Sequence, residues 1–134
     1  MLGINIFRKK QDLGAWGESL AAKVYEKDGY KILDKNFFNR FGKQLGEIDL
    51  IAFKPGLIVF VEVKTRTNEK FGTPAEAVDR QKRRKLIQAC KYFQSINPQF
   101  ANFSFRIDVA EVKTSLDRDD KYVNIIENAV EDDI

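Results

Sequence analysis

Three charged side chains interrupt two apolar segments of this 134-residue chain. Asp49 lies within GEIDLIAF, and Glu62 and Lys64 lie within IVFVEVKTR. Carboxylates held close together repel each other unless a proton or a cation compensates their charge. A divalent ion between them would polarise a phosphoryl oxygen and lower the pKa of a bound water. An adjacent ammonium would stabilise the negative charge that develops in such a reaction.

The spacing predicts that these residues meet across a β-hairpin. If residues 55–56, Pro-Gly, are the two central turn residues, antiparallel pairing places Asp49 opposite Glu62 and Glu47 opposite Lys64. Opposed residues have Cβ atoms about 5 Å apart, which is close enough for two carboxylates to share a cation. Because L-Pro-Gly suits a two-residue hairpin poorly, a longer loop or a bulge would shift this register.

Alternation along the second strand separates its charged residues from its apolar ones. Glu62 and Lys64 are two positions apart and project from one face of the strand. Val59, Val61 and Val63 project from the other face, which we expect to enter the core. A second interpretation of the same spacing is a solvated strand face on which the charges form cross-strand ion pairs.

The order of hydrophobic patterns predicts one α/β domain over residues 1–134, with a central mixed β-sheet flanked by α-helices. The core is expected over about 12–112. The acid-rich segment 116–134 is compatible with disorder, a short terminal helix or a last strand. Strands are expected over residues 30–41, 46–53, 58–66, 103–112 and 121–130.

Two helices are expected, and the first contains two unfavourable residues. The first covers 12–28, and the second follows a capping box that begins at Thr73 and extends to about Ser95. Gly14 and Gly17 each cost the first helix about 1 kcal/mol relative to alanine. They indicate either that another element packs closely against this turn or that the helix begins later.

Composition limits the chemistry that the chain can perform. The sequence has no histidine and one cysteine, Cys90, which excludes Ser-His-Asp and Cys-His catalysis and imidazole-based zinc sites. A catalytic metal would have oxygen ligands, which favour Mg²⁺ or Mn²⁺. The N-terminus has a short apolar run followed by positive charge, the reverse of a secretory signal, so we expect a cytoplasmic protein without membrane contact.

The net charge of +3 is small, but residues 80–85, RQKRRK, concentrate basic side chains on the second helix. Phosphate contact is one interpretation, and a solvated helix face is the other. Contact with DNA through this helix would be directed at the backbone and would depend strongly on salt. The candidate contacts are Arg80, Lys82, Arg83 and Arg84, with Arg40 and Arg66 near the strands.

An ordered set of motifs resembles the YraN-like family of predicted nucleases. The set comprises GAWGESLAAKVY, NFFNRFGKQLGEIDLIA, FVEVKTR, Gln81-Lys82 and FRIDVAEV, and it covers about residues 12–112. Within it, Ile48-Asp49 followed by Glu62-Val63-Lys64 looks like the PD-(D/E)xK nuclease pattern, with Ile in place of its loosely kept Pro.

This resemblance implies a restriction-endonuclease-like fold, as in archaeal Holliday-junction resolvases. It implies that Asp49 and Glu62 bind Mg²⁺ or Mn²⁺ and that Lys64 is the catalytic lysine. It also implies that Glu18 is an additional acidic residue of the metal site and that Gln81 is directed at the site. Without the resemblance, Glu18 is an ordinary carboxylate on a helix face.

Three functional hypotheses remain open from the sequence. The first is a metal-dependent endonuclease that acts on DNA, with branched or junction DNA as one candidate substrate. Symmetric cutting of a junction would need two sites and therefore a homodimer. The second is a non-catalytic nucleic-acid-binding or adaptor module that keeps the nuclease fold, and the third is a protein–protein scaffold that uses the acidic tail.

Overall fold

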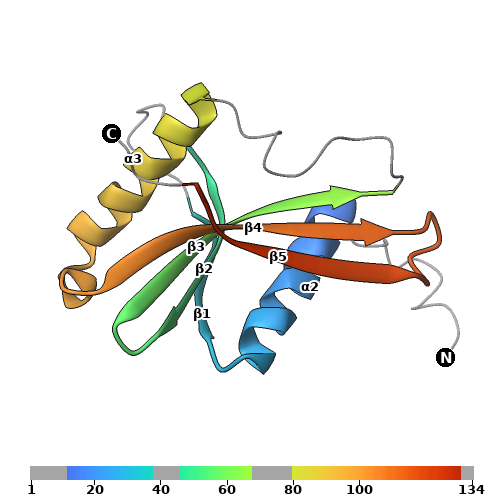
Figure 1. Ribbon diagram of the computed structural model, residues 1–134, viewed down its shortest axis with the longest axis horizontal. Coiled ribbons are helices and arrows are strands. Elements are labelled where there is room, and N and C mark those ends of the chain that lie inside the picture. The colour runs from blue at the N-terminus through green and yellow to red at the C-terminus, as the bar shows by residue number, and fades with distance from the viewer. Residues whose placement is uncertain (1–11, 38–45, 68–79, 131–134) are drawn as a thin grey trace, which may run out of the picture.

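The computed structural model describes residues 12–37, 46–67 and 80–130, and these form the mixed α/β sheet with flanking helices that the sequence predicts (Figure 1). The strand order is β1-β2-β3-β4-β5; β3 and β4 are parallel, and the other neighbours are antiparallel. This architecture is that of the restriction-endonuclease-like fold. The elements are α2 (Leu13–Lys27), β1 (Lys31–Phe37), β2 (Ile48–Lys54), β3 (Leu57–Arg66), α3 (Arg80–Ile96), the 3₁₀ turn η2 (Pro98–Phe100), β4 (Ser104–Thr114) and β5 (Lys121–Val130).

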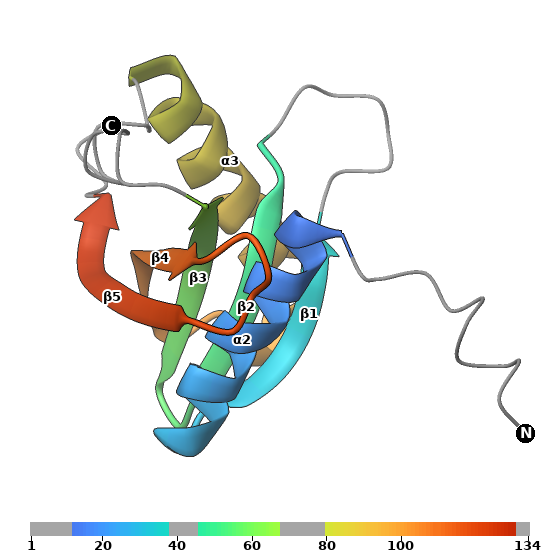
Figure 2. The ribbon, with the colours of Figure 1, turned by 90° about the vertical axis from the view of Figure 1, so that its right-hand side faces the viewer.

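The two helices pack on opposite faces of the strongly twisted sheet (Figures 1 and 2). Alternate residues of β3 divide between these faces: Phe60 packs with the α3 side, whereas Val59 and Val61 pack with the α2 side. The predicted core face of β3 is therefore confirmed. The predicted apolar stripe of α3 is also confirmed, and its buried members are Leu86, Cys90 and Phe93.

Helix α2 begins early and packs tightly against β3. The Asp12 side chain caps the helix by accepting a hydrogen bond from the Ala15 N–H at 2.8 Å. A Cβ atom added to Gly17 would overlap with the side chain of Thr65, including Oγ1. Of the two explanations for the glycines, close packing therefore holds at Gly17, and a late helix start does not, because the helix begins at Leu13.

A second close approach places the first turns of α3 beside the start of β2. The Gly46 N–H donates a hydrogen bond to the Lys85 carbonyl at 3.2 Å. A Cβ atom on Gly46 would lie 3.0 Å from the Leu86 backbone nitrogen. The basic end of α3 is therefore held close to the strand that carries Asp49.

A buried carboxylate ties the last strand into the core. Asp108 is fully buried and accepts hydrogen bonds from the Tyr25 hydroxyl at 2.7 Å, Arg106 Nε at 2.9 Å and the Asn128 N–H at 3.0 Å. The contact from Asn128 reaches into β5, which pairs with β4. Of the alternatives for the acid-rich segment 116–134, a last strand over residues 121–130 is the one observed.

The start of the second helix cannot be compared with its prediction. The capping box that begins at Thr73 lies outside the described residues, and α3 is described from Arg80 to Ile96, one residue beyond the expected end. Within the residues that the structure describes, neither helix combines the length and the apolar character needed to cross a membrane.

Replacing Gly17 by alanine should lower the free energy of unfolding by about 1–3 kcal/mol, because the new methyl group overlaps with Thr65. Urea denaturation measures this change. Gly14→Ala is the matched control in the same helix: among the described residues, its Cβ meets only Asp12 Oδ1, at 3.4 Å. That variant should gain up to about 1 kcal/mol from helix propensity. Equal effects of the two substitutions would contradict the close approach of α2 to β3.

Candidate active site

The β2–β3 hairpin brings two carboxylates together at the end of its ladder. Leu50 pairs with Val61, which is the register that the sequence predicts. One residue beyond this pair, Asp49 Oδ2 accepts a hydrogen bond from the Val63 N–H at 2.8 Å. The side chain of Asp49 is thereby fixed against β3, beside Glu62.

Glu62 is nearly buried and lies between two ammonium groups. Its side chain is 8% exposed, and its Oε1 atom lies 3.0 Å from Lys64 Nζ and 3.1 Å from Lys82 Nζ. Lys64 comes from the same strand, whereas Lys82 comes from the first turn of α3. The charged residues of β3 therefore do not form a solvated strand face, because α3 covers Glu62.

Asp49 holds a proton unusually firmly. Burial and the negative charges of Glu62 and Glu18 together raise the pKa of Asp49 to about 7, against the Val63 N–H, which lowers it. A hydrogen bond to Glu62 adds to the rise in the pKa of Asp49, because only the protonated acid can donate it. Asp49 and Glu62 are therefore close enough that both cannot carry a full negative charge without compensation.

Glu18 of α2 lies near enough to this pair for its charge to raise the pKa of Asp49. Burial raises the pKa of Glu18, and the charge of Glu47 acts in the same direction, whereas a hydrogen bond with Asn36 lowers it. Glu47, which the predicted register places opposite Lys64, thus lies close enough to Glu18 to influence it. The role of Glu18 as a further acidic residue of the metal site stays a prediction.

The pKa values of the two lysines beside Glu62 are shifted in opposite directions. Burial lowers the pKa of Lys64, and a hydrogen bond with Lys82 lowers it further, against the attraction of Glu62. Burial also disfavours the charged form of Lys82, but Lys64, Glu62 and Asp49 together outweigh it and raise the pKa of Lys82. Lys82 is therefore the more firmly charged partner.

The donor set suits a hard divalent cation held by few protein ligands. Within residues 12–37, 46–67 and 80–130, no three side chains of His, Cys, Asp or Glu are gathered closely enough to form a metal site by themselves. Mg²⁺, however, commonly takes one or two carboxylates and completes its shell with water and substrate phosphates. Asp49 and Glu62 provide such a pair, and their mutual repulsion is what a cation would relieve.

The predicted nucleic-acid contacts are distributed over two elements. Of the predicted residues on α3, Arg80, Gln81, Lys82 and Arg84 are exposed, and Arg83 is half-buried. Arg66 lies at the end of β3, and Arg40 lies outside the described residues. Gln81 lies in the turn that faces the site, and its role there stays a prediction.

Lys82 is the residue whose position the sequence did not indicate. It was grouped with the basic helix residues as a phosphate contact, and the structure places its ammonium on Glu62. The resemblance contained the signal, since Gln81-Lys82 belonged to the matching motifs. Because Lys82 lies far from Glu62 in the sequence, nothing in the pattern indicated that the two side chains are in contact.

Comparison with known proteins places the chain in a family. Residues 17–112 match the model of "Uncharacterised protein family UPF0102". The chain belongs to this family. The matched range contains every residue of the carboxylate and lysine cluster, from Glu18 to Lys82.

Relatives in the UPF0102 family match most of the chain. A "UPF0102 protein" of Clostridium perfringens (strain SM101 / Type A) is 40% identical over 119 residues, which are 89% of this chain and 93% of the relative. One from Caldanaerobacter subterraneus subsp. tengcongensis is 47% identical over 104 residues, or 77% and 80% of the two chains. One from Syntrophomonas wolfei is 47% identical over 90 residues, or 67% and 75%.

The stability of the metal-free protein should fall as pH rises from about 4 to 7. The pKa of Asp49 rises on folding from 3.8 to about 7, so the folded state binds its proton more tightly. The resulting stabilisation is complete below about pH 4 and is lost as pH rises through 7. Chemical denaturation in EDTA at several pH values measures this loss.

Asp49→Asn is the matched variant for this test. Its amide imitates the protonated acid, and its carbonyl can still accept the Val63 N–H. The variant should therefore lose less stability than the wild type over the same pH interval. Parallel pH profiles of the two proteins would show that Asp49 does not titrate near neutrality.

Proposed function

We propose that this UPF0102 protein is a Mg²⁺- or Mn²⁺-dependent endonuclease that hydrolyses phosphodiester bonds in DNA. The observation that carries the proposal is the pair Asp49 and Glu62 with Lys64 in contact with Glu62 at 3.0 Å. Two adjacent carboxylates and an amine at a strand end are the PD-(D/E)xK arrangement that the sequence resembles.

Each residue has a defined role in this proposal. Asp49 and Glu62 hold the divalent ion, and Glu18 adds negative charge to its surroundings. When bound, the ion supplies a polarised phosphoryl oxygen and neutralises charge that builds up during in-line attack. Lys64 hydrogen-bonds the attacking water and orients it towards phosphorus.

The basic residues of α3 would then position the DNA backbone. Arg80 and Arg84 are exposed on the same helix as Lys82, whose ammonium contacts Glu62. Contacts of this kind fix the register of a nucleic acid without reading its sequence. DNA lying along α3 would thus pass directly over the carboxylate pair, and branched DNA remains a candidate substrate.

One observation favours the non-catalytic alternative. The charge of Glu62 is compensated by Lys64 and Lys82, and Asp49 is compensated by a proton near neutral pH. The cluster is therefore electrostatically satisfied by the protein alone. A DNA-binding or adaptor module could keep such a cluster for stability, and only a cleavage assay separates the two functions.

Glu62→Gln and Lys64→Ala should each reduce cleavage by at least about 100-fold, because each removes a group that acts on the transition state. The assay compares linear, single-stranded, flap and four-way DNA, each in Mg²⁺, Mn²⁺ or EDTA. EDTA should abolish the activity. Glu26→Gln, which neutralises an exposed carboxylate on α2, should cleave like the wild type.

DNA binding measured on the same variants separates catalysis from affinity. Both site variants should still bind DNA within a few-fold of the wild type. Cleavage that persists in EDTA would rule out the metal mechanism. A wild-type protein that binds these DNAs and cleaves none of them would support the adaptor module instead.

A further inference from the structure

The sheet face that carries the candidate active site continues past α3 to a hollow at the strand ends. Figure 1 shows β3, β4 and β5 extending well beyond the part of the sheet that α3 covers. At that end lies a hollow of about 620 Å³, a volume typical of sites for small organic groups. It is lined by Arg66, Thr67, Lys113, Thr114, Ser115, Asp120, Lys121 and Tyr122.

This hollow lies in line with the proposed catalytic residues. Glu62, Lys64 and Arg66 alternate along β3 and so project from one face of the sheet. Arg66 pairs with Lys113 on β4, which in turn pairs with Tyr122 on β5. Because strands are about 4.8 Å apart, these three side chains form a row across the sheet, about 13 Å along β3 from Glu62.

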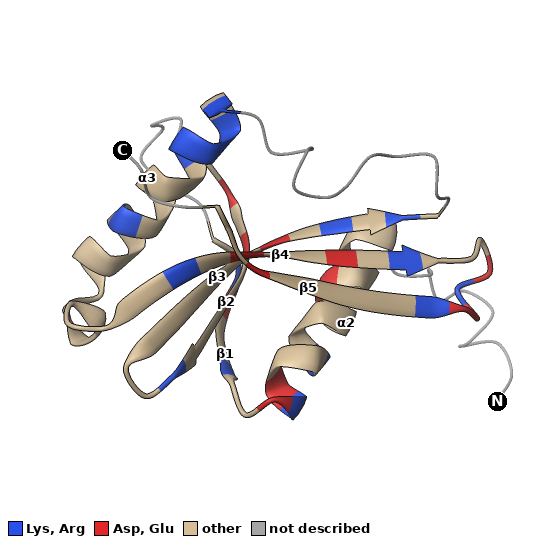
Figure 3. Ribbon diagram, viewed as in Figure 1, with Lys and Arg blue, Asp and Glu red and all other residues tan. Residues whose placement is uncertain are grey.

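The hollow is basic. Arg66, Lys113 and Lys121 bring three positive charges, and Asp120 brings one negative charge. Lys113 also lies 3.6 Å from Glu111, but its side chain remains 40% exposed. Figure 3 shows basic residues both on the first turns of α3 and on the ends of β3, β4 and β5, with acidic residues in the turn beyond.

An exposed aromatic ring accompanies this positive charge. Tyr122 is 56% exposed, although a tyrosine at the end of a strand gains stability by burying its ring. An aromatic ring beside cations is the combination on which unpaired bases stack while their phosphates are neutralised. A duplex keeps its bases stacked inside and offers such a ring little to contact.

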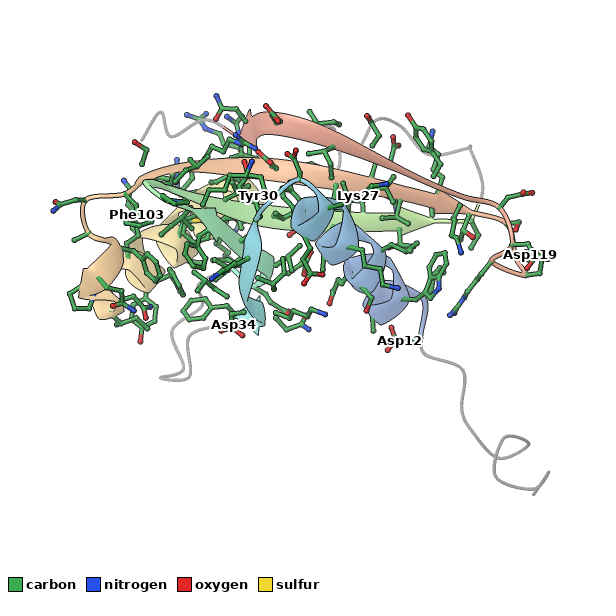
Figure 4. All side chains as sticks on the ribbon, turned by 90° about the horizontal axis from the view of Figure 1, so that it is seen from below. Asp12, Lys27, Tyr30, Asp34, Phe103 and Asp119 are labelled. Carbon is green, nitrogen blue, oxygen red and sulfur yellow. The ribbon has the colours of Figure 1, made fainter. Side chains whose placement is uncertain are left out.

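The wall of the hollow is well supported. Thr114 Oγ1 donates a hydrogen bond to the Asp120 carbonyl at 2.7 Å, and Ser115 N–H donates to the same carbonyl at 3.0 Å. Arg118 lies over the Trp16 ring, 5.3 Å from its centroid, which connects this turn to the start of α2. Figure 4 shows the turn with Asp119 at the same end of the molecule as Asp12, the cap of α2.

We propose that this hollow binds an unpaired nucleic-acid strand that leaves the active site along β3, with a base stacked on Tyr122 and phosphates contacting Arg66, Lys113 and Lys121. The inference rests on the proposed nuclease function and specifies its substrate class: nucleic acid with a single-stranded arm. DNA and RNA strands share the required chemistry, so the test includes both.

The test measures the binding of fluorescein-labelled dT12, U12 and a 12-base-pair duplex to the full chain by anisotropy, in EDTA so that cleavage plays no part. Tyr122→Ala should weaken dT12 binding about tenfold, whereas Tyr122→Phe, which keeps the ring, should stay within about twofold. Duplex binding should change less than about twofold in both variants. Tighter binding of dT12 or of U12 identifies the preferred strand.

Charge is tested separately with matched lysines. Lys121→Ala should weaken dT12 binding a few-fold and reduce its dependence on salt. Lys23→Ala removes an exposed lysine from α2 and should leave binding unchanged. The inference would be overturned if wild type, Tyr122→Ala and Lys121→Ala bound dT12 with equal affinity. It would also be overturned if polyglutamate displaced labelled dT12 as well as unlabelled dT12 does.

The result is separable from the proposed catalysis. If no DNA is cleaved but Tyr122→Ala still weakens dT12 binding, the hollow stands as a binding site and the nuclease proposal fails. The opposite result is flap DNA that is cleaved in Mg²⁺ while Tyr122→Ala changes neither dT12 binding nor the preference for flap over blunt duplex. That result would overturn the hollow as a strand-binding site and leave the nuclease proposal unaffected.

Discussion

Repulsion between two neighbouring carboxylates is the constraint around which the site is organised. Asp49 and Glu62 are brought together by a hairpin register that the buried residues on both strands enforce. A shift of one residue would move every core side chain of the strand to the wrong face. The fold therefore maintains the repulsive pair, and the surrounding groups have to compensate its charge with protons, ammonium groups or a cation.

The two helices change that charge in opposite senses, from opposite faces of one sheet. Lys82 of α3 compensates the charge of Glu62, whereas Glu18 of α2 adds to the negative charge around Asp49. The contact of Gly17 with Thr65 holds the turn of α2 that carries Glu18, and the contact of Gly46 with α3 holds the turn that carries Lys82. A Cβ atom at Gly17 would overlap with Thr65, and one at Gly46 would push against the backbone of α3. Close backbone packing thus determines which charges surround the carboxylates.

Local patterns in the sequence were sufficient for the elements and for the hairpin. Alternation predicted the two faces of β3, the Pro-Gly turn predicted the pairing of its neighbours, and helical spacing predicted the buried stripe of α3. Asp108 pairs with Arg106, two residues away on the same strand. These features depend on residues that are close along the chain or joined by one short turn.

Features that depend on tertiary packing were not accessible in this way. The contact of Lys82 with Glu62 depends on where α3 lies against the sheet, and the hydrogen bond from Asn128 to Asp108 depends on how β5 lies beside β4. The row of Arg66, Lys113 and Tyr122 arises from the register of three strands, two of them far from β3 in sequence.

The most direct test of this account is the binding of Mn²⁺ to the protein, measured by electron paramagnetic resonance and calorimetry in the absence of nucleic acid. The account predicts one strongly bound ion per chain in the wild type. Asp49→Ala and Glu62→Ala should each weaken it by at least about tenfold, because each removes one of two charged ligands. Mn²⁺ binding that is absent in the wild type, or as strong in both variants as in the wild type, would contradict the shared-cation site.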